Sequence, residues 1–326
     1  MVITRLTKIS LVISTFVFVT NGNSLLNNNC DYSLHHQIIT CVNIDFKNAH
    51  LEYYITNDTH VLIIKECSNL EIPSNYHDGN SFRHITSYQL VNNGIITIDS
   101  FAFDKLSDLR YLKIDNNKNW LSLKANTFAG LEKLEMLSIV NNSMQTLEND
   151  AFKGLKDLDV LDLRYNQLTV IPSSIFKPLQ RLTSLFLPQN NIHTLEQDCF
   201  EGLVKVELID ITFNNLETIN PRTFNSLTRL SDLYLSNNKI SQIGGTFSLP
   251  NLKFLYLQYN NLNAIDKDTF SSILNLQAID LSNNKINIIA DDEFYNLKHL
   301  HLINLRNNSA SSFSNLRFSS KPVIVV

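Results

Sequence analysis

The chain has 326 residues, 44% of them hydrophobic and 18% charged, which is the composition of a folded protein rather than a disordered one. Its formal net charge of −4 gives no electrostatic reason to expect a nucleic acid partner. A chain of this length would ordinarily suggest two compact domains, but a long internal repeat overrides that expectation.

The first residues have the features of a secretory signal peptide, which we place at residues 1–22. Arg5 and Lys8 give a positive start, 9–19 is apolar, and the residues around Gly22 are small enough for cleavage. An uncleaved membrane anchor is the alternative, but the apolar run is short for a span. We therefore expect a secreted chain without a membrane span, folding in an oxidising, extracellular environment.

Residues 23–81 do not fit the repeat and are predicted to form an N-terminal cap with a degenerate first repeat, because an array needs its exposed end covered. Cys30 and Cys41 lie close in the sequence and are expected to form a disulfide within this cap. Two interpretations of Cys67 remain open. In the first interpretation it is a buried thiol that occupies the Asn position of the repeat described below, a position where Cys is also found. In the second it forms a disulfide with a cysteine of the cap.

Residues 82–318 consist of ten repeat units, and residues 319–326 are left as a C-terminal tail. Apolar residues occupy the first, fourth and sixth positions of a unit and Asn the ninth, as in LDVLDLRYNQL from Leu158 onward. This pattern and length resemble the leucine-rich repeat. The units follow one another at intervals of 22, 24 or 25 residues and begin at Ile85, Leu109, Leu134, Leu158, Leu182, Val206, Leu230, Leu252, Leu276 and Leu300.

The repeat predicts an α/β solenoid, the leucine-rich-repeat horseshoe, with a parallel concave sheet and an irregular or short-helical convex side. The apolar positions alternate through a short strand whose inward side chains line the core. The ninth-position Asn both donates and accepts hydrogen bonds, so it can bridge successive turns. A Phe near the nineteenth position recurs in every unit and is expected to fill the convex wall. One unit cannot bury its apolar face alone, and stacking supplies the core.

The concave surface is the predicted binding face. The third and fifth positions of each strand should point away from the core, and the eighth lies at the strand's exit. In the units from Leu182 to Leu252 these positions are rich in aromatics flanked by acids, as in a protein-binding hot spot. Alternatively, scattered exposed aromatics need no explanation. The candidate protein-binding residues are Phe186, Phe213, Tyr234, Phe254, Tyr256, Tyr259, Asp210 and Asp232.

Sequence motifs for catalysis are absent. The chain has no G-x-S-x-G, no H-E-x-x-H, no P-loop and no G-x-G-x-x-G, so we expect neither enzyme activity nor a cofactor. The nine His residues are scattered without further ligand candidates at metal spacing, and we expect them on the surface.

Three N-x-Ser/Thr sequences, at Asn57, Asn141 and Asn307, are candidate N-glycosylation sites. Cys199 is too many units away from Cys67 to bond with it. An unpaired Cys in a secreted chain indicates either a buried thiol or a covalent partner. The buried thiol is favoured because Cys is among the most buried residue types.

The repeats resemble the extracellular leucine-rich repeats of Toll-type receptors, slit-like ligands and insect immune proteins. The segment CDYSLHHQIITCVNIDF, followed by VLIIKECSNLEIP, resembles the amino-terminal region of mosquito leucine-rich-repeat immune proteins. Those are secreted haemolymph proteins of complement-like defence. The resemblance implies an extracellular protein partner and a role in innate immune recognition.

The longer members of that group add a cysteine-rich segment and a coiled coil, and this chain departs from them. No cysteine cluster follows Phe318 and no heptad segment is present, so the chain is similar to a short, coil-less member or to a truncated one. The alternative function is a cell-adhesion or matrix scaffold, or a receptor ectodomain lacking its anchor, because the repeat serves very different partners.

Overall fold

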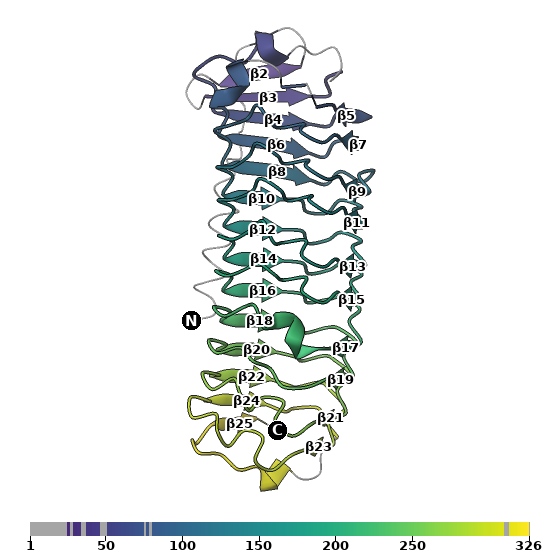
Figure 1. Cartoon of the computed structure of the whole chain (residues 1–326). Helices are drawn as coiled ribbons and strands as arrows, with labels where there is room; N and C mark the ends of the chain where they lie inside the picture. The colour runs from purple at the N-terminus through teal and green to yellow at the C-terminus, as the bar shows by residue number, and fades with distance from the viewer. Residues whose placement is uncertain are drawn as a thin grey trace.

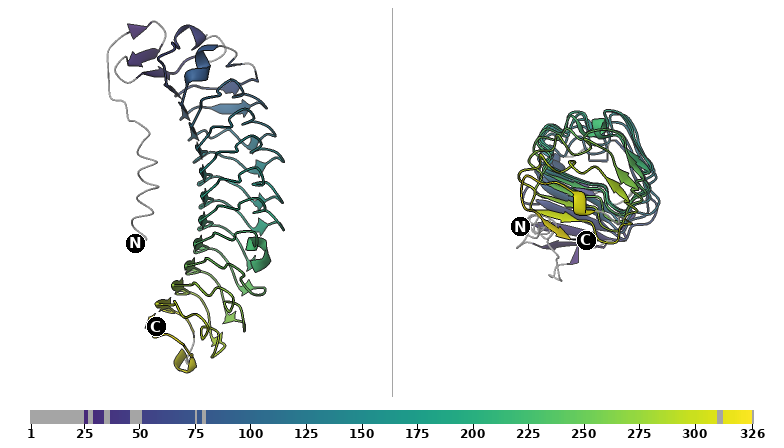
Figure 2. Two further views of the ribbon diagram at one scale, coloured as in Figure 1. Left: turned by 60° about the vertical axis from the view of Figure 1, so that its left-hand side comes forward. Right: turned by 90° about the horizontal axis from the view of Figure 1, so that it is seen from below.

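The computed structural model describes residues 25–26, 29–33, 37–45, 51–74, 76–77, 80–309 and 313–325. These residues form a curved solenoid whose successive turns stack along one axis, with a long sheet on one side and short strands on the other (Figures 1 and 2). The predicted signal peptide, residues 1–22, lies outside the described residues.

The long sheet contains 15 strands in the described part of the chain. The first two pairings, within the cap, are antiparallel, and every later pairing is parallel. In order, the strands are β1 (Leu25–Leu26), β2 (Cys30–Ser33), β3 (Ile38–Val42), β4 (Val61–Lys65), β6 (Ser87–Val91), β8 (Tyr111–Asp115), β10 (Met136–Ser138), β12 (Val160–Asp162), β14 (Ser184–Phe186), β16 (Leu208–Asp210), β18 (Asp232–Tyr234), β20 (Phe254–Tyr256), β22 (Ala278–Asp280), β24 (Leu302–Asn304) and β25 (Val323–Val325).

Equivalent positions of the repeat face each other across the whole sheet. Val160 pairs with Ser184, Ser184 with Leu208, and Leu208 with Asp232, each being the third residue of its unit. The repeat register read from the sequence is therefore confirmed. The segment assigned as the C-terminal tail contains the strand β25, which pairs with β24 and extends the sheet.

The convex side carries short strands and single turns of 3-10 helix, which confirms the expected architecture. Paired two- to four-residue strands replace longer helices there: β5 (Leu70–Ile72), β7 (Ile95–Ile98), β9 (Ser122–Leu123), β11 (Thr146–Leu147), β13 (Val170–Ile171), β15 (Thr194–Leu195), β17 (Thr218–Ile219), β19 (Gln242–Ile243), β21 (Ala264–Ile265) and β23 (Ile288–Ile289). The 3-10 turns are η1 (Leu51–Tyr53), η2 (Asn80–His84), η3 (Pro221–Phe224) and η4 (Phe313–Asn315).

Between the two sides lies one continuous apolar core, whose convex wall is a ladder of Phe rings. Adjacent rings from Phe103 to Phe318 have centroids 5.4 to 6.5 Å apart, within the range of favourable aromatic pairs. Each ring between the two ends of the ladder therefore lies against a ring of the turn on either side, and the core is shared along the array.

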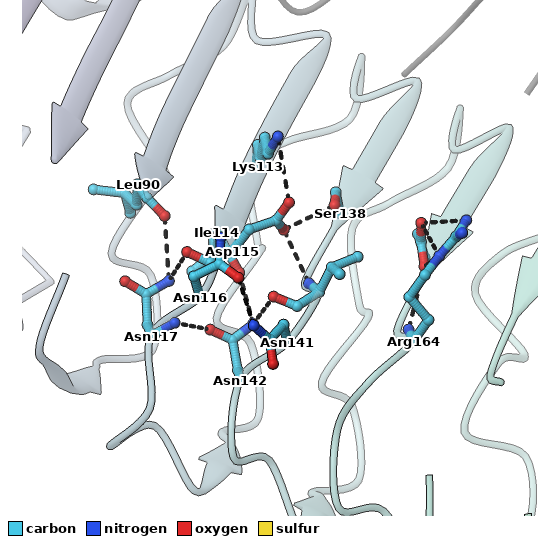
Figure 3. Close-up of polar contacts among 12 residues, drawn as sticks. Leu90, Lys113, Ile114, Asp115, Asn116, Asn117, Ser138, Asn141, Asn142 and Arg164 are labelled. Atoms are coloured by element: carbon cyan, nitrogen blue, oxygen red, sulfur yellow. Dashed lines mark hydrogen bonds and ion pairs between the residues drawn. The ribbon is translucent and has the colours of Figure 1, made fainter. Parts of the chain in front are cut away.

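The ninth-position Asn side chains bridge successive turns as the repeat requires. Asn214 is typical: its Oδ1 accepts from the Ile192 amide at 2.9 Å, and its Nδ2 donates to the Leu187 carbonyl at 3.0 Å. Figure 3 shows the corresponding Nδ2 contacts near the start of the array, where Asn117 donates to the Leu90 carbonyl and Asn142 to the Ile114 carbonyl of the preceding turn. The buried backbone N–H and C=O groups at the corner where each turn leaves the concave sheet thus have hydrogen-bond partners, although water does not reach them.

The cap is closed by the expected disulfide between Cys30 and Cys41, which face each other on β2 and β3. Cys67 is a free, buried thiol. Its amide donates to Asn93 Oδ1 at 2.9 Å, so it takes the place of Asn at the foot of the ladder. Of the two interpretations of Cys67, the buried thiol is confirmed, and the disulfide to the cap is wrong.

His77 corrects the expectation that every His lies on the surface. Its ring is 1% exposed at the junction between cap and array. Nδ1 donates to the Ala102 carbonyl at 2.7 Å, and the rings of Phe82, Tyr88 and Phe103 surround it. Burial lowers the pKa of His77 from 6.5 to about 4. The fold therefore holds this imidazole in its neutral form.

This burial predicts a loss of stability in mild acid. The unfolded chain protonates His77 below pH 6.5 while the folded chain resists down to about pH 4, so stability falls across that window. At pH 5 the free energy of unfolding should be about 2 kcal/mol lower through this group. Urea unfolding at pH 7 and pH 5 should show the loss in the wild type and in a His193→Gln control. The loss of stability between pH 7 and pH 5 should be smaller in His77→Gln. A loss as large as that of the wild type would contradict the assignment of the acid effect to His77.

Candidate functional site

Six of the eight predicted concave residues lie on four adjacent strands of the sheet, β14, β16, β18 and β20. The register places Phe186, Asp210, Tyr234 and Tyr256 in one column, the fifth positions of their units. Asp232 and Phe254 pair in the neighbouring column of third positions. Because strands in a sheet lie about 4.8 Å apart, these six side chains form one contiguous surface.

The centre of this surface is a pair of stacked tyrosines. The rings of Tyr234 and Tyr256 lie with centroids 4.7 Å apart and an interplanar angle of 8°. Both side chains are half-buried, and burial raises the pKa of Tyr256, with the carboxylates of Asp232 and Asp280 adding to the effect. The pair is a flat, rigid aromatic platform with negative charge beside it.

Phe186 differs from the expectation of an exposed aromatic. It is 4% exposed, yet it lies outside the main hydrophobic core. The guanidinium of Arg164 covers its ring, with Cζ 5.3 Å from the centroid. Arg164 is itself held by Asp162, its Nε donating to the two carboxylate oxygens at 2.8 and 2.9 Å. The concave face therefore carries an Arg–Phe stack at this position (Figure 3 shows Arg164).

Carboxylates border the aromatic platform. Asp210 accepts from the Thr212 amide at 2.9 Å, and burial raises the pKa of its carboxyl group. Asp232 is 4% exposed. Asp280 accepts from the Ser282 amide at 2.9 Å and from Asn304 Nδ2 at 3.0 Å. These bonds hold Asp210 and Asp280 in place beside Tyr234 and Tyr256.

Toward the cap the concave face changes character. Asp115 is paired there: its Oδ1 accepts from Ser138 Oγ at 2.8 Å and from the Val140 amide at 2.9 Å, and Lys113 Nζ lies 3.5 Å from Oδ2 (Figure 3). Burial raises the pKa of the Asp115 carboxyl group. This cluster satisfies its own charges, which sets it apart from the acidic and aromatic region further along.

The two remaining predicted residues lie beside the sheet and not on it. Phe213 and Tyr259 follow the concave strands in turns, with φ of 55° and 57°, and are 51% and 56% exposed. Tyr165 occupies the same position of its unit and is 49% exposed. It belongs with them, although it was not among the candidate residues. Its position in the repeat is the signal by which the sequence could have identified it.

All three candidate glycosylation sites, Asn57, Asn141 and Asn307, are exposed. Asn141 Nδ2 donates to Asn116 Oδ1, and Asn307 Nδ2 donates to Asn283 Oδ1, at 2.6 and 2.9 Å. Neither residue belongs to strands β14 to β20, so the aromatic platform is clear of both.

Cys199 lies on the convex turn next to Phe200 and is fully buried in the core. Burial raises the pKa of its thiol. A disulfide with an external partner would require this turn to open first. The geometry favours the buried-thiol interpretation.

The burial of both free thiols predicts that neither reacts in the folded protein. With a thiol-specific reagent at pH 8, folded protein should show no rapid labelling, whereas protein in denaturant should be labelled at Cys67 and Cys199. Mass mapping of the labelled peptides identifies each site. Labelling of Cys199 in the folded protein at nearly the denatured rate would contradict the buried-thiol interpretation.

Across the described ranges the structure shows no group of three or more His, Cys, Asp or Glu residues arranged to hold a metal ion. In the same residues no helix is long and apolar enough to cross a membrane.

Part of the chain is 35% identical over 98 residues to Toll-like receptor 3 of Bos taurus, covering 29% of this chain and 11% of the receptor. The chain spans about a tenth of the length of the curated relatives it matches.

Solved structures share the fold. A chain of the LRIM1/APL1C complex has a TM-score of 0.68 at 22% identity, covering 84% of this chain and 49% of that one. A chain from the complex of Latrophilin 3, Unc5D and FLRT2 has a TM-score of 0.69 at 22% identity, covering 90% and 92%. The leucine rich repeat family matches residues 83–144, 114–168, 137–192, 157–216, 180–240, 205–262 and 250–309, more than half of the chain. This protein therefore belongs to the leucine-rich-repeat family.

Proposed function

We propose that this protein is secreted and binds another protein through its concave face, as a recognition component of insect-type innate immunity. The observation that carries the proposal is the stacked Tyr234–Tyr256 platform bordered by acids on β16 to β22. Aromatic side chains held rigidly in a partly desolvated patch lose little entropy on binding and dominate the energy of protein interfaces.

The charge of the platform indicates the chemistry of the partner. Asp210, Asp232 and Asp280 lie around two tyrosine rings, whose faces attract cations. The Arg164–Phe186 stack supplies one cation at the border, and it is already paired with Asp162. We infer a partner that presents Lys or Arg side chains, since complementary charge speeds association and excludes acidic surfaces.

Secretion and the immune role are supported by different observations. The disulfide in the cap suits an oxidising environment. The relatives include Toll-like receptor 3 and the LRIM1/APL1C complex. A second candidate function, an adhesion or matrix scaffold, is favoured by the likeness to the complex that contains FLRT2. The identity of the protein partner distinguishes the two functions. A soluble defence protein as partner supports the immune role, and a cell-surface receptor supports the adhesion or matrix role.

The test is capture of partners from extracellular fluid of the source organism by the secreted chain. The variant bait carries Tyr234→Ser, Phe254→Ser and Tyr256→Ser, and the control bait carries Tyr295→Ser on the convex side, where the ring is 51% exposed. Wild-type and control baits should hold the same protein, and the variant should lose it. Raising the salt concentration should weaken capture, because the attraction to a basic partner is screened.

Two results would count against the proposal. Equal capture by the variant and the wild type would move the site to the convex side or the cap. Release of the partner only by a reducing agent would instead indicate a covalent link through Cys199.

Secretion has its own test in the three candidate glycosylation sites. Expression in insect cells should deliver the chain to the medium, and enzymatic removal of N-glycans should lower its mass and convert each occupied site among Asn57, Asn141 and Asn307 to Asp. Retention of an unglycosylated chain inside the cells would contradict secretion.

A further inference from the structure

The eighth residues of the ten repeat units form a column of their own beside the concave sheet. All ten have a left-handed backbone, with φ between 53° and 61°. Asn tolerates this conformation better than most residues and holds six of the ten places. We call these residues the exit column: Asn92, Asn116, Asn141, Tyr165, Gln189, Phe213, Asn237, Tyr259, Asn283 and Asn307.

Aromatic residues occupy three alternate places in the middle of the exit column. Tyr165, Phe213 and Tyr259 are 49%, 51% and 56% exposed, so the core does not require their rings. A bulky side chain in the left-handed region is strained compared with Asn, and strain of this kind is often associated with function. The fold would be served at least as well by Asn at all three places. Stabilising the fold therefore does not explain why these three places carry aromatic rings.

The spacing of the three rings follows from the solenoid. Backbone hydrogen bonds link each turn to the next along the column, from Tyr165 to Pro188, from Gln189 to Thr212 and from Phe213 to Ser236, at 3.0 to 3.1 Å. Turns bonded in this way lie about 4.8 Å apart, so aromatic residues on alternate turns recur about every 10 Å.

Amide side chains fill the places between the rings. Gln189 and Asn237 alternate with the aromatics in the column, and Asn191, two residues after Gln189, is exposed. Within the described residues the structure shows no hydrogen bond from these three side chains, so their donors and acceptors face solvent. The exit column itself carries no charged residue. A ligand that matches it is uncharged, rich in hydroxyl or amide groups, and periodic.

We propose that the exit column from Tyr165 to Tyr259 binds a linear β-1,4-linked glycan. The C–H face of a sugar ring stacks on an aromatic ring, and amides donate to and accept from sugar hydroxyl and acetamido groups. In an extended β-1,4-linked chain successive sugars alternate in orientation, so the same face recurs once per disaccharide, a length equal to two turns of this solenoid. Chitin and cellulose share this chemistry.

The surroundings of the row leave room for such a chain. The candidate glycosylation sites Asn141 and Asn307 lie in the same column but outside the row, one turn before Tyr165 and two turns after Tyr259. The row is also separate from the tyrosine platform on the sheet. A glycan on the exit column and a protein on the concave face can be bound independently.

The test measures binding of chitohexaose and cellohexaose by calorimetry, with chitin and cellulose pull-down in parallel. The principal variant combines Tyr165→Asn, Phe213→Asn and Tyr259→Asn, which installs the residue that this column carries elsewhere. The wild type should bind at least one of the two sugars, and the two arms distinguish an acetamido sugar from glucose. The variant should bind at least about tenfold more weakly, with an unchanged or higher unfolding midpoint.

Two further variants make the test specific. Tyr295→Asn removes a ring of the same exposure from the convex side and should leave glycan affinity unchanged. Gln189→Phe combined with Phe213→Asn keeps three aromatics but breaks the alternate-turn spacing, so it should also weaken binding. The Tyr234→Ser, Tyr256→Ser variant of the concave platform should retain the glycan, which separates this inference from the proposed protein-binding function.

Three outcomes would overturn the inference. The first is that the wild type binds neither hexasaccharide. The second is that the triple Asn variant binds a hexasaccharide as tightly as the wild type does. The third is binding of a polyproline peptide that the triple variant loses while sugars do not bind. A polyproline II helix repeats at about 9.3 Å and also docks on aromatic rows, so it is the ligand that the same spacing would otherwise select.

Discussion

Replacing Phe200 by Ala is expected to lower the free energy of unfolding by about 3 to 5 kcal/mol. The ring is fully buried, with its centroid 6.3 Å from that of Phe176 and 5.4 Å from that of Phe224. Its removal leaves a cavity between two turns that the stacked neighbours prevent from collapsing. Because each turn is stabilised mainly by the turns beside it, a defect in the middle of the array should divide one cooperative unit into two.

Urea unfolding followed by circular dichroism measures this effect. Val204→Ala is the matched control, since Val204 lies in the same turn and is 51% exposed, and it should change stability by no more than about 0.5 kcal/mol. The variant should show a lower midpoint or two separate transitions. A Phe200→Ala chain as stable as the control would contradict the continuous Phe ladder.

Replacing Asn214 by Ala should cost about 1 to 3 kcal/mol, because the buried Ile192 amide is left without an acceptor, while the Leu187 carbonyl keeps Asn190 Nδ2 as a donor. The Ile192 amide loses its acceptor, and the Leu187 carbonyl loses a donor. Water cannot replace the side chain at this inner corner, where Asn214 is 6% exposed.

The neighbouring Asn191 provides the control for the ladder. Its side chain is exposed, so Asn191→Ala should leave the unfolding midpoint nearly unchanged. Hydrogen exchange adds a local readout, since the Ile192 amide should lose protection in Asn214→Ala first. Similar stability of the two variants would mean that the ladder contributes little.

The repeat made most of the fold predictable, because its residue types follow directly from the geometry of the turn. Asn at the ninth position and Phe near the nineteenth identify the inner corner and the convex wall, and the structure places Asn214 and Phe200 there. The disulfide between Cys30 and Cys41 was predictable for a similar reason, since their short separation allows two adjacent strands to bring them together.

Contacts between side chains of different turns were not predictable. The burial of Phe186 depends on Arg164, one turn earlier, lying over its ring, and no pattern within a single unit reveals this. His77 is buried because the cap and the first turns enclose it jointly. The strand β25 forms because Val323 meets an open sheet edge at Leu302.

The candidate site was predictable to the same extent. Alternation along the strand placed Tyr234, Tyr256 and Asp210 on the concave face, and the parallel register brought them together. The stacking of the two tyrosines and the left-handed turns under Phe213 and Tyr259 depend on the backbone of neighbouring turns. The sequence therefore predicted which side chains lie near one another, and the structure divides them between a sheet platform and an exit column.

The central claim is that a protein partner covers the tyrosine platform on the concave sheet. Hydroxyl-radical footprinting of the captured complex, read by mass spectrometry, tests it most directly because it reports the exposure of each aromatic side chain. Tyr234, Phe254 and Tyr256 should be oxidised more slowly in the complex than in the free chain, while Tyr53 and Tyr295, 80% and 51% exposed, should react at the same rate in both. Protection of Tyr53 or Tyr295 with an unchanged rate at Tyr234 and Tyr256 would contradict the account and place the partner on the cap or the convex side.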